Sequence, residues 1–132
     1  MSASHILLVE DNDVNAYLAT FLLTRHGLAV ERARDGVECL AAVRAAPPAV
    51  VLMDLQMPRM DGFEAARALL ADPATRDVPL IAVSAFAMAG DRTRALAMGF
   101  ADYIEKPYDP QQFVACVSGY LKPPLAPETP LP

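Results

Sequence analysis

Short apolar runs alternate along this chain with stretches in which apolar residues recur at helical spacing. The apolar runs predict strands at 5–9, 28–33, 49–53, 78–83 and 101–104. The stretches that follow them predict helices at 13–26, 37–46, 63–70, 91–98 and 110–121. This alternation of strand and helix predicts an α/β fold in which a doubly wound, five-stranded parallel sheet carries helices on both faces. The strand order 2-1-3-4-5 is the common one for a sheet of this size.

The first and fourth helices can be described in more detail. Asp13 and Asp91 are suitable N-cap residues for these two helices. Val14, Leu18 and Leu22 recur at helical spacing, which marks them as the apolar stripe of the first helix.

The run 49–53 is apolar throughout and leads directly into Asp54. A continuous apolar run of this kind predicts a strand buried on both faces of a parallel sheet, whereas the mixed run 28–33 suits a sheet edge. Ligands bind at the carboxyl ends of strands in such sheets. Asp54 is therefore a candidate for chemistry, although an Asp in this place can also merely cap the next turn.

Other predicted strands bring polar residues to the same edge of the sheet. Glu10 and Asp11 follow the first strand, Ser84 follows the fourth, and Lys106 comes after the fifth. Carboxylates that converge repel one another unless a cation compensates, and their oxygens suit Mg²⁺ or Mn²⁺. With an ammonium and a hydroxyl beside it, a nucleophilic Asp54 would have the positioning and charge neutralisation that phosphoryl transfer requires.

Composition and charge narrow the class of protein. The chain has 132 residues, of which 54% are hydrophobic and 20% charged, as expected for one globular domain. Its apolar runs are too short to span a bilayer and no signal peptide is seen, so we expect a cytoplasmic protein without membrane insertion. The net charge of −5 and the lack of a basic stripe argue against direct nucleic-acid binding. Cys39 and Cys116 are expected to be free thiols.

Two segments are expected from the distribution of prolines. We expect residues 1–121 to form the domain and residues 122–132, which are rich in proline, to form a disordered tail. Such a tail is inert, or the start of a truncated linker, or a binding segment for a partner.

Several linked motifs occur in order along the chain: Glu10-Asp11, Asp54 followed by Pro58-x-x-Asp61-Gly62, Ser84-Ala85, and Tyr103-x-x-Lys106-Pro107. Together they resemble the receiver domain of two-component response regulators, the CheY-like superfamily. The resemblance covers residues 5–121 and implies a flavodoxin-like fold. Asn12, Asn15 and the run 85–91 further resemble stand-alone DivK-type cell-cycle regulators and the receivers of hybrid kinases.

The resemblance implies a Mg²⁺ site. Asp11, Asp54 and the backbone carbonyl of Gln56 would bind the ion. Glu10 stands where Asp is commoner in the family and would act mainly through metal-bound water.

The resemblance also implies that Asp54 takes a phosphoryl group from a phosphohistidine on a kinase or a phosphotransfer protein. Lys106 would contact a phosphoryl oxygen, Ser84 would bond the phosphoryl group, and Tyr103 would turn inward as part of the switch, unless Tyr103 is simply a core aromatic. The Lys106–Pro107 bond would be cis. Gln56 and Phe86 occupy positions that tune the lifetime of the acyl phosphate in the family.

Two surfaces are candidates for partner binding. Tyr17 and Phe21, one helical turn apart, could form a docking patch for the phosphodonor together with Pro107 and Tyr108, unless both aromatic side chains are buried. The other surface, formed by the last two helices and the strand between them, would bind a downstream target. The candidate contact residues on these surfaces are Tyr17, Phe21, Phe86, Met88, Tyr103, Pro107 and Tyr108.

The sequence is therefore interpreted as a single-domain response regulator without an output domain, and not as a turnover enzyme. Alternatives are a degenerate receiver that binds partners without phosphorylation and a receiver excised from a hybrid histidine kinase. A phosphatase or dehalogenase with an Asp nucleophile would have a second Asp at the position of Gln56 and a cap domain. A carrier of FMN would need a Ser/Thr/Gly-rich loop where this chain has the acidic segment 10–13.

Overall fold

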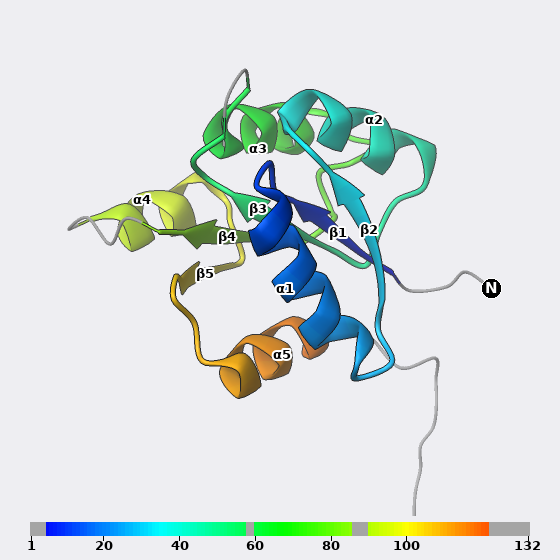
Figure 1. Ribbon diagram of the computed structural model, residues 1–132. Coiled ribbons are helices and arrows are strands. Elements are labelled where there is room, and N and C mark those ends of the chain that lie inside the picture. The colour runs from blue at the N-terminus through cyan, green and yellow to red at the C-terminus, as the bar shows by residue number, and fades with distance from the viewer. Residues whose placement is uncertain (1–4, 58–59, 86–89, 122–132) are drawn as a thin grey trace, which may run out of the picture.

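A computed structural model of the protein describes residues 5–57, 60–85 and 90–121. In these residues the sheet consists of β1 (His5–Val9), β2 (Ala29–Ala33), β3 (Val50–Asp54), β4 (Leu80–Ser84) and β5 (Asp102–Glu105). The helices are α1 (Asp13–Thr24), α2 (Gly36–Ala45), α3 (Gly62–Ala71), α4 (Asp91–Met98) and α5 (Pro110–Ser118). All strands are parallel, in the order β2-β1-β3-β4-β5, which confirms the predicted fold (Figure 1).

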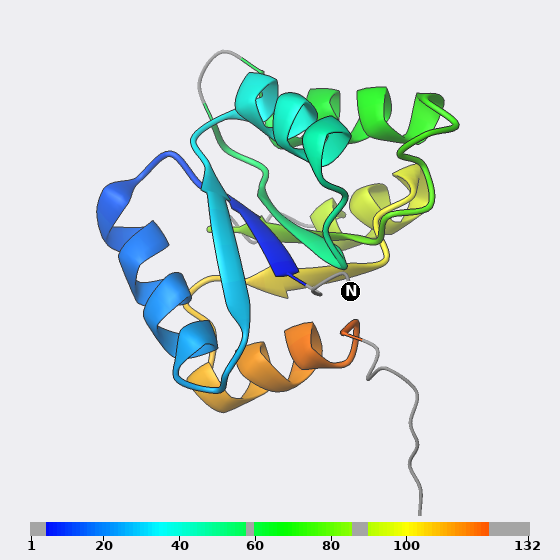
Figure 2. The ribbon, with the colours of Figure 1, turned by 90° about the vertical axis from the view of Figure 1, so that its right-hand side faces the viewer.

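The helices form a layer on each face of the sheet (Figures 1 and 2). On one face α2, α3 and α4 pack through Val43, Leu69 and Ala95. On the other face α1 and α5 pack through residues such as Leu23 and Phe113. The core is thus split into two apolar layers with the sheet between them, as a doubly wound fold requires.

The central strands are buried on both faces, as their apolar sequences predict. Every residue of β3 and of β4 is buried, while β2 at the edge alternates between exposed and partly buried positions before it ends in buried Ala33. The central strands have a strand on each side, whereas β2 has only β1 beside it, and this accounts for its greater exposure. The sheet therefore holds the carboxyl end of β3 rigidly in the middle of the molecule.

The buried face of α1 is not the one expected from sequence. Ala16, Ala19 and Leu23 are buried, whereas Val14 and Leu18 are exposed. Small alanine side chains let the helix axis approach the sheet closely, and this turns the larger apolar stripe toward the surface. The helix that Val14, Leu18 and Leu22 predict is present, but their apolar stripe is not its buried face, although Leu22 is partly buried against the core.

Two predicted N-caps are also wrong. Asn12 is the cap of α1, where its side chain accepts a hydrogen bond from the Asn15 N–H, while the Asp13 carboxylate binds arginines from β2 and the segment after it. The cap of α4 is Gly90, with φ +92°, and Asp91 is the first residue inside the helix. At α1 two adjacent polar residues can serve as the cap, and Asn12 has the extended backbone that an N-cap requires. At α4 no side chain caps the helix, because Gly90 occupies the cap position.

Both cysteines are free thiols, as expected. Across the part of the chain that the structure describes, no helix has the length and apolar composition needed to cross a membrane.

We expect Gly62→Ala to destabilise the protein and to displace Asp54. A Cβ at position 62 would lie 2.6 Å from the Asp54 carbonyl oxygen and 2.9 Å from Leu55 Cα, and backbone atoms cannot rotate away. The free energy of unfolding should fall by about 2–3 kcal/mol, measured by chemical denaturation. In the control Gly27→Ala, a Cβ would meet nothing within 4 Å, so the φ of +81° alone should cost about 1 kcal/mol. An equal loss in both variants would contradict this account.

Candidate metal centre

The carboxyl ends of four strands bring the predicted site residues together. Glu10 and Asp11 directly follow β1, Asp54 is the last residue of β3, Ser84 is the last residue of β4, and Lys106 follows β5. Neighbouring strands are in parallel register at this edge, with Asp54 beside Val83 and Ser84 beside Glu105. Glu10, Asp54 and Ser84 are buried and Asp11 is exposed. The site is therefore a buried acidic pocket that opens to solvent beside Asp11.

The three carboxylates are close enough to hold one cation. Glu10, Asp11 and Asp54 each offer a ligand oxygen, and these oxygens lie within 4.8 Å of one another. A hard divalent ion such as Mg²⁺ prefers this kind of all-oxygen donor set and keeps several waters of its own. The donor chemistry thus fits the ion that the sequence predicts, with Asp11 and Asp54 as the residues to hold it.

Lys106 supplies the only positive charge in direct contact with these carboxylates among the described residues. Its Nζ lies 2.9 Å from Glu10 Oε1 and 3.5 Å from Asp54 Oδ2. The other oxygen of Glu10 accepts the Asn12 N–H at 3.2 Å. Both oxygens of Glu10 therefore already have protein partners, which suits an indirect role for Glu10 at the metal. The Lys106–Pro107 bond is cis, as predicted.

Burial dominates the electrostatics of Asp54. It raises the pKa of this carboxyl from 3.8 to about 6, against the lowering effect of the Gln56 N–H, which donates to Asp54 Oδ1 at 2.9 Å. The negative charge of Glu10 also raises the pKa, and Lys106 lowers it. The pocket thus holds more negative charge than its own lysine can neutralise, and a bound cation would relieve this imbalance.

The Gln56 side chain has a contact that the sequence did not predict. Its Nε2 donates to Ser84 Oγ at 3.1 Å, and its Oε1 accepts the Ala85 N–H at 3.3 Å. Gln56 therefore ties the end of β4 to the turn after β3. Its position two residues after Asp54 had marked it for the lifetime of the acyl phosphate, but nothing in the sequence pairs it with Ser84. The role of its carbonyl as a metal ligand stays a prediction.

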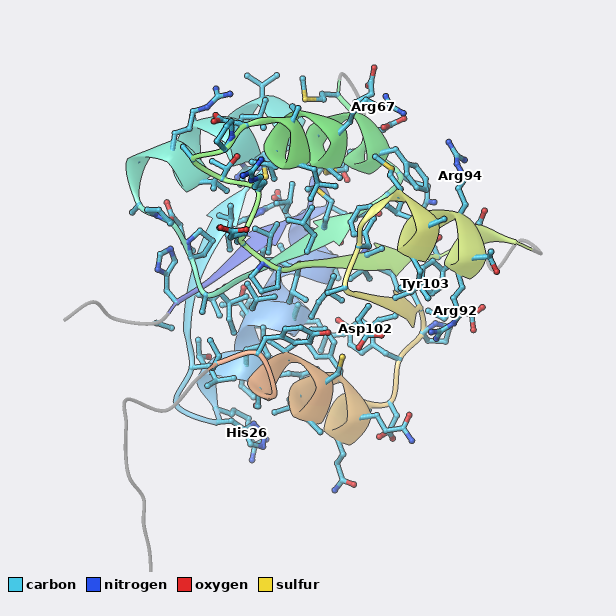
Figure 3. The ribbon with its side chains drawn as sticks, turned by 180° about the vertical axis from the view of Figure 1, so that it is seen from behind. His26, Arg67, Arg92, Arg94, Asp102 and Tyr103 are labelled. Atoms are coloured by element: carbon cyan, nitrogen blue, oxygen red, sulfur yellow. The ribbon has the colours of Figure 1, made fainter. Side chains whose placement is uncertain are left out.

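Tyr103 is turned inward and buried in the core on the α4 side of the sheet. Arg92 of α4 lies over its ring, with the guanidinium carbon 5.4 Å from the ring centre, and donates to the Tyr103 carbonyl at 3.2 Å. Figure 3 shows these two side chains next to each other beside α4. Burial fits both the inward position of a switch and an ordinary core aromatic, so the role of Tyr103 in switching stays a prediction, and the contact with Arg92 was not predicted.

An exposed aromatic patch lies on α1. Tyr17 is 71% exposed and Phe21 is 44% exposed, and their rings stack with centres 6.3 Å apart. The alternative that both are buried core residues is therefore wrong. Beside this patch, Leu18 lines a pocket of about 320 Å³ together with residues of the site and the loop after β5. The other lining residues are Asn15, Ala85, Lys106, Pro107 and Tyr108.

The second candidate surface contains a pocket of about 350 Å³ between α4, β5 and α5. Arg92, Tyr103, Tyr108 and Gln112 are among the residues that line it. Phe86 and Met88, which the sequence analysis also assigned to partner binding, lie outside the described residues.

Comparisons with known proteins agree with this geometry. A family model described as the response regulator receiver domain matches residues 6–118. The polar-differentiation response regulator DivK of Brucella anthropi is 38% identical over 116 residues, which cover 88% of this chain and 94% of that protein. Two solved receiver domains of histidine kinases superpose with TM-scores of 0.82. One is from Pseudomonas aeruginosa and has a magnesium ion coordinated in its active site cleft. It is 32% identical to this chain, and the match covers 91% of this chain and 98% of that chain. The other, from Syntrophus aciditrophicus, is 30% identical and covers 90% of each chain.

We expect Asp54→Asn to stabilise the metal-free protein at neutral pH. The raised pKa of Asp54 means that the folded state binds a proton at this carboxyl more tightly than the unfolded state does. The bound proton therefore stabilises the folded wild type fully below pH 3.8, and this contribution is lost as the pH rises through about 6. Asn is uncharged at every pH and can still accept the Gln56 N–H. At pH 7.5 the free energy of unfolding of the variant should be about 1–3 kcal/mol higher than that of the wild type, as measured by chemical denaturation.

Two controls accompany this measurement. The gain should disappear below pH 4, and saturating Mg²⁺ should reduce it, because the ion stabilises the wild type by binding the folded state. A variant that is less stable than the wild type at pH 7.5 without metal would contradict the charge imbalance.

Proposed function

Because this chain belongs to the response regulator receiver family, we propose that it is a cytoplasmic phosphorylation switch in which Asp54 accepts a phosphoryl group from a phosphohistidine. The observation that carries this proposal is the cluster of Glu10, Asp11 and Asp54 oxygens within 4.8 Å, with Lys106 Nζ against two of the three carboxylates. An Asp54 that only capped a turn would not need two further carboxylates and a lysine beside it. A degenerate receiver would not need the complete set of metal-binding carboxylates and lysine.

The two oxygens of Asp54 have different partners, which supports a division of labour. Oδ1 is held by the Gln56 N–H, while Oδ2 faces Lys106 Nζ. We assign Oδ2 as the nucleophile: it forms the new P–O bond as the P–N bond to the donor histidine breaks and the electron pair stays on the imidazole. A bound Mg²⁺ would neutralise charge on the phosphoryl oxygens. Lys106 moves from the carboxylates to a phosphoryl oxygen as charge develops there.

Ser84 and Tyr103 would pass this change to the surface. Ser84 Oγ now binds the side chain of Gln56 and would leave it to donate to the phosphoryl group. Tyr103 is a residue of β5, its side chain is buried on the α4 side of the sheet, and its carbonyl is bound by Arg92 of α4. Phosphorylation would thus alter the surface on which a downstream partner binds.

The exposed patch on α1 is the surface we propose for the phosphodonor, a histidine kinase or a histidine phosphotransfer protein. Tyr17 and Phe21 are exposed on α1, and their neighbour Leu18 lines a pocket that includes Lys106 itself. Exposed apolar clusters of this kind mark protein interaction sites. A donor seated there would bring its phosphohistidine to Asp54.

The match to DivK, which extends over 94% of that relative, supports a DivK-type regulator. Receivers of histidine kinases also match, with TM-scores of 0.82, so the fold alone does not separate a DivK-type regulator from the receiver of a hybrid kinase. The choice of kinase and of downstream target would depend on the residues of the docking surfaces and not on those of the metal centre.

We expect acetyl phosphate to phosphorylate the protein in the presence of Mg²⁺. Intact mass should increase by one phosphoryl group, because the site needs only a donor with a good leaving group and a cation to neutralise the charge. The adduct should disappear in Asp54→Asn and after chelation of Mg²⁺. If neither acetyl phosphate nor an active kinase gives an adduct, the protein is a constitutive binding module instead.

We expect the double variant Tyr17→Ala, Phe21→Ala to slow phosphotransfer from a phosphorylated donor protein by at least about tenfold. Aromatic side chains that a bound partner buries at the centre of an interface typically cost more than about 1 kcal/mol each when truncated. The rate with acetyl phosphate should not change, since this small donor needs no docking surface. Val37→Ala, which truncates an exposed apolar residue on α2, is the matched control. Unchanged transfer from the donor protein would place docking elsewhere.

A further inference from the structure

An arginine of the edge strand holds the loop that carries the candidate metal ligands. Residues 10–12 connect β1 to α1, which begins at Asp13. Arg32 in β2 donates Nε and Nη2 to the Glu10 carbonyl oxygen, at 3.0 and 2.9 Å. Its Nη1 donates to Asp13 Oδ1 at 2.8 Å. One guanidinium group therefore binds both ends of this loop.

Arg32 itself is well fixed by its surroundings. Figures 1 and 2 show β2 beside α1, and in the sheet Arg32 lies next to Leu8 of β1. Its side chain is only 24% exposed and lines a hollow with Ala16 and Tyr17 of α1. A side chain held in this way can impose its geometry on the loop.

Asp11 lies between the two points that Arg32 binds. Its carboxylate is exposed, and the structure records no side-chain hydrogen bond for it among the residues described. The backbone alone therefore places this carboxylate opposite Asp54. A shift of the Glu10 carbonyl or of Asp13 would move it.

We propose that Arg32 is a positioning residue of the metal centre, which raises the affinity for Mg²⁺ by fixing the loop so that Asp11 faces Asp54. This inference rests on the Mg²⁺ site of the proposed function. It requires the fork geometry of arginine, whose several N–H groups reach two acceptors at once. A lysine has a single ammonium group and cannot bind the carbonyl and the carboxylate with the same spread of donors.

Arg34 offers a matched control within the same chain. Its Nη1 binds the same Asp13 Oδ1, at 3.0 Å. Its side chain is 58% exposed, and the structure records no contact between it and the Glu10 carbonyl among the described residues. The two arginines thus share a charge and a partner and differ in the contact with the loop backbone.

The direction of the effect separates positioning from simple charge. A guanidinium near a divalent cation repels it, so Coulomb's law alone predicts that removing Arg32 strengthens Mg²⁺ binding. Loss of a residue that orients metal ligands weakens binding instead.

The test is calorimetric titration of Mg²⁺ into the wild type, Arg32→Gln, Arg32→Lys and Arg34→Gln. Circular dichroism checks that each protein is folded at the temperature used. Both Arg32 variants should raise the Kd for Mg²⁺ about tenfold, and Arg34→Gln should change it less than about twofold, as expected for an exposed ion pair. With acetyl phosphate, the Mg²⁺ concentration for half-maximal rate should rise by the same factor as the Kd. The maximal rate at saturating Mg²⁺ should stay within about twofold, because the ion then compensates for the looser loop.

Several outcomes would overturn the inference. Unchanged or tighter Mg²⁺ binding in Arg32→Gln would show that charge, not position, governs the site, and the proposed function would still stand. An equal loss of affinity in Arg34→Gln would show that the contact of Arg32 with the loop backbone has no special role. Full affinity in Arg32→Lys would show that the fork geometry of arginine is not required. If Arg32→Gln does not fold, Arg32→Lys alone decides between these results. A wild type that binds no Mg²⁺ would overturn both this inference and the proposed function.

Discussion

The structure depends on a concentration of negative charge at one edge of its sheet. Glu10 and Asp54 are buried side by side, and Lys106 is the cation in contact with both. Burial raises the pKa of Asp54 to about 6, which means that the folded protein holds this carboxylate at a cost. A domain that needed only stability would replace such a cluster with apolar residues. The cost is understandable if the pocket is completed by a cation and a phosphoryl group.

The fold makes this cluster possible by geometry rather than by local attraction. Parallel strands all end at the same edge, so residues far apart in sequence meet there without any long-range pairing signal of their own. The fully buried β3 and β4 fix Asp54 and Ser84, and Gly62 packs so closely against the Asp54 carbonyl that a Cβ at this position would clash with it. The rigid sheet therefore fixes Asp54 and Ser84 at its edge, and the segments that follow β1 and β5 add Glu10, Asp11 and Lys106.

This division explains what could be predicted from sequence. Continuous apolar runs and the acids that follow them are local signals, so the strands, their order and the residues at their ends were accessible. The packed face of α1 was not, because Ala16 and Ala19 compete with larger residues for the core and only the helix–sheet distance decides. The bonds from Gln56 to Ser84 and from Arg32 to Glu10 join side chains to distant partners, and no spacing in the sequence encodes them.

The exposed apolar surface of α1 and the charged site share Lys106. This residue lines the pocket beside Leu18 and at the same time contacts Glu10 and Asp54. A donor that fills the pocket excludes water next to the ammonium group, and in a less polar environment the attraction of Lys106 for a phosphoryl oxygen becomes stronger. Docking on α1 would then do more than bring the donor near. It would strengthen the charge interaction that transfer requires, which gives a physical reason for the exposed position of Leu18, Tyr17 and Phe21.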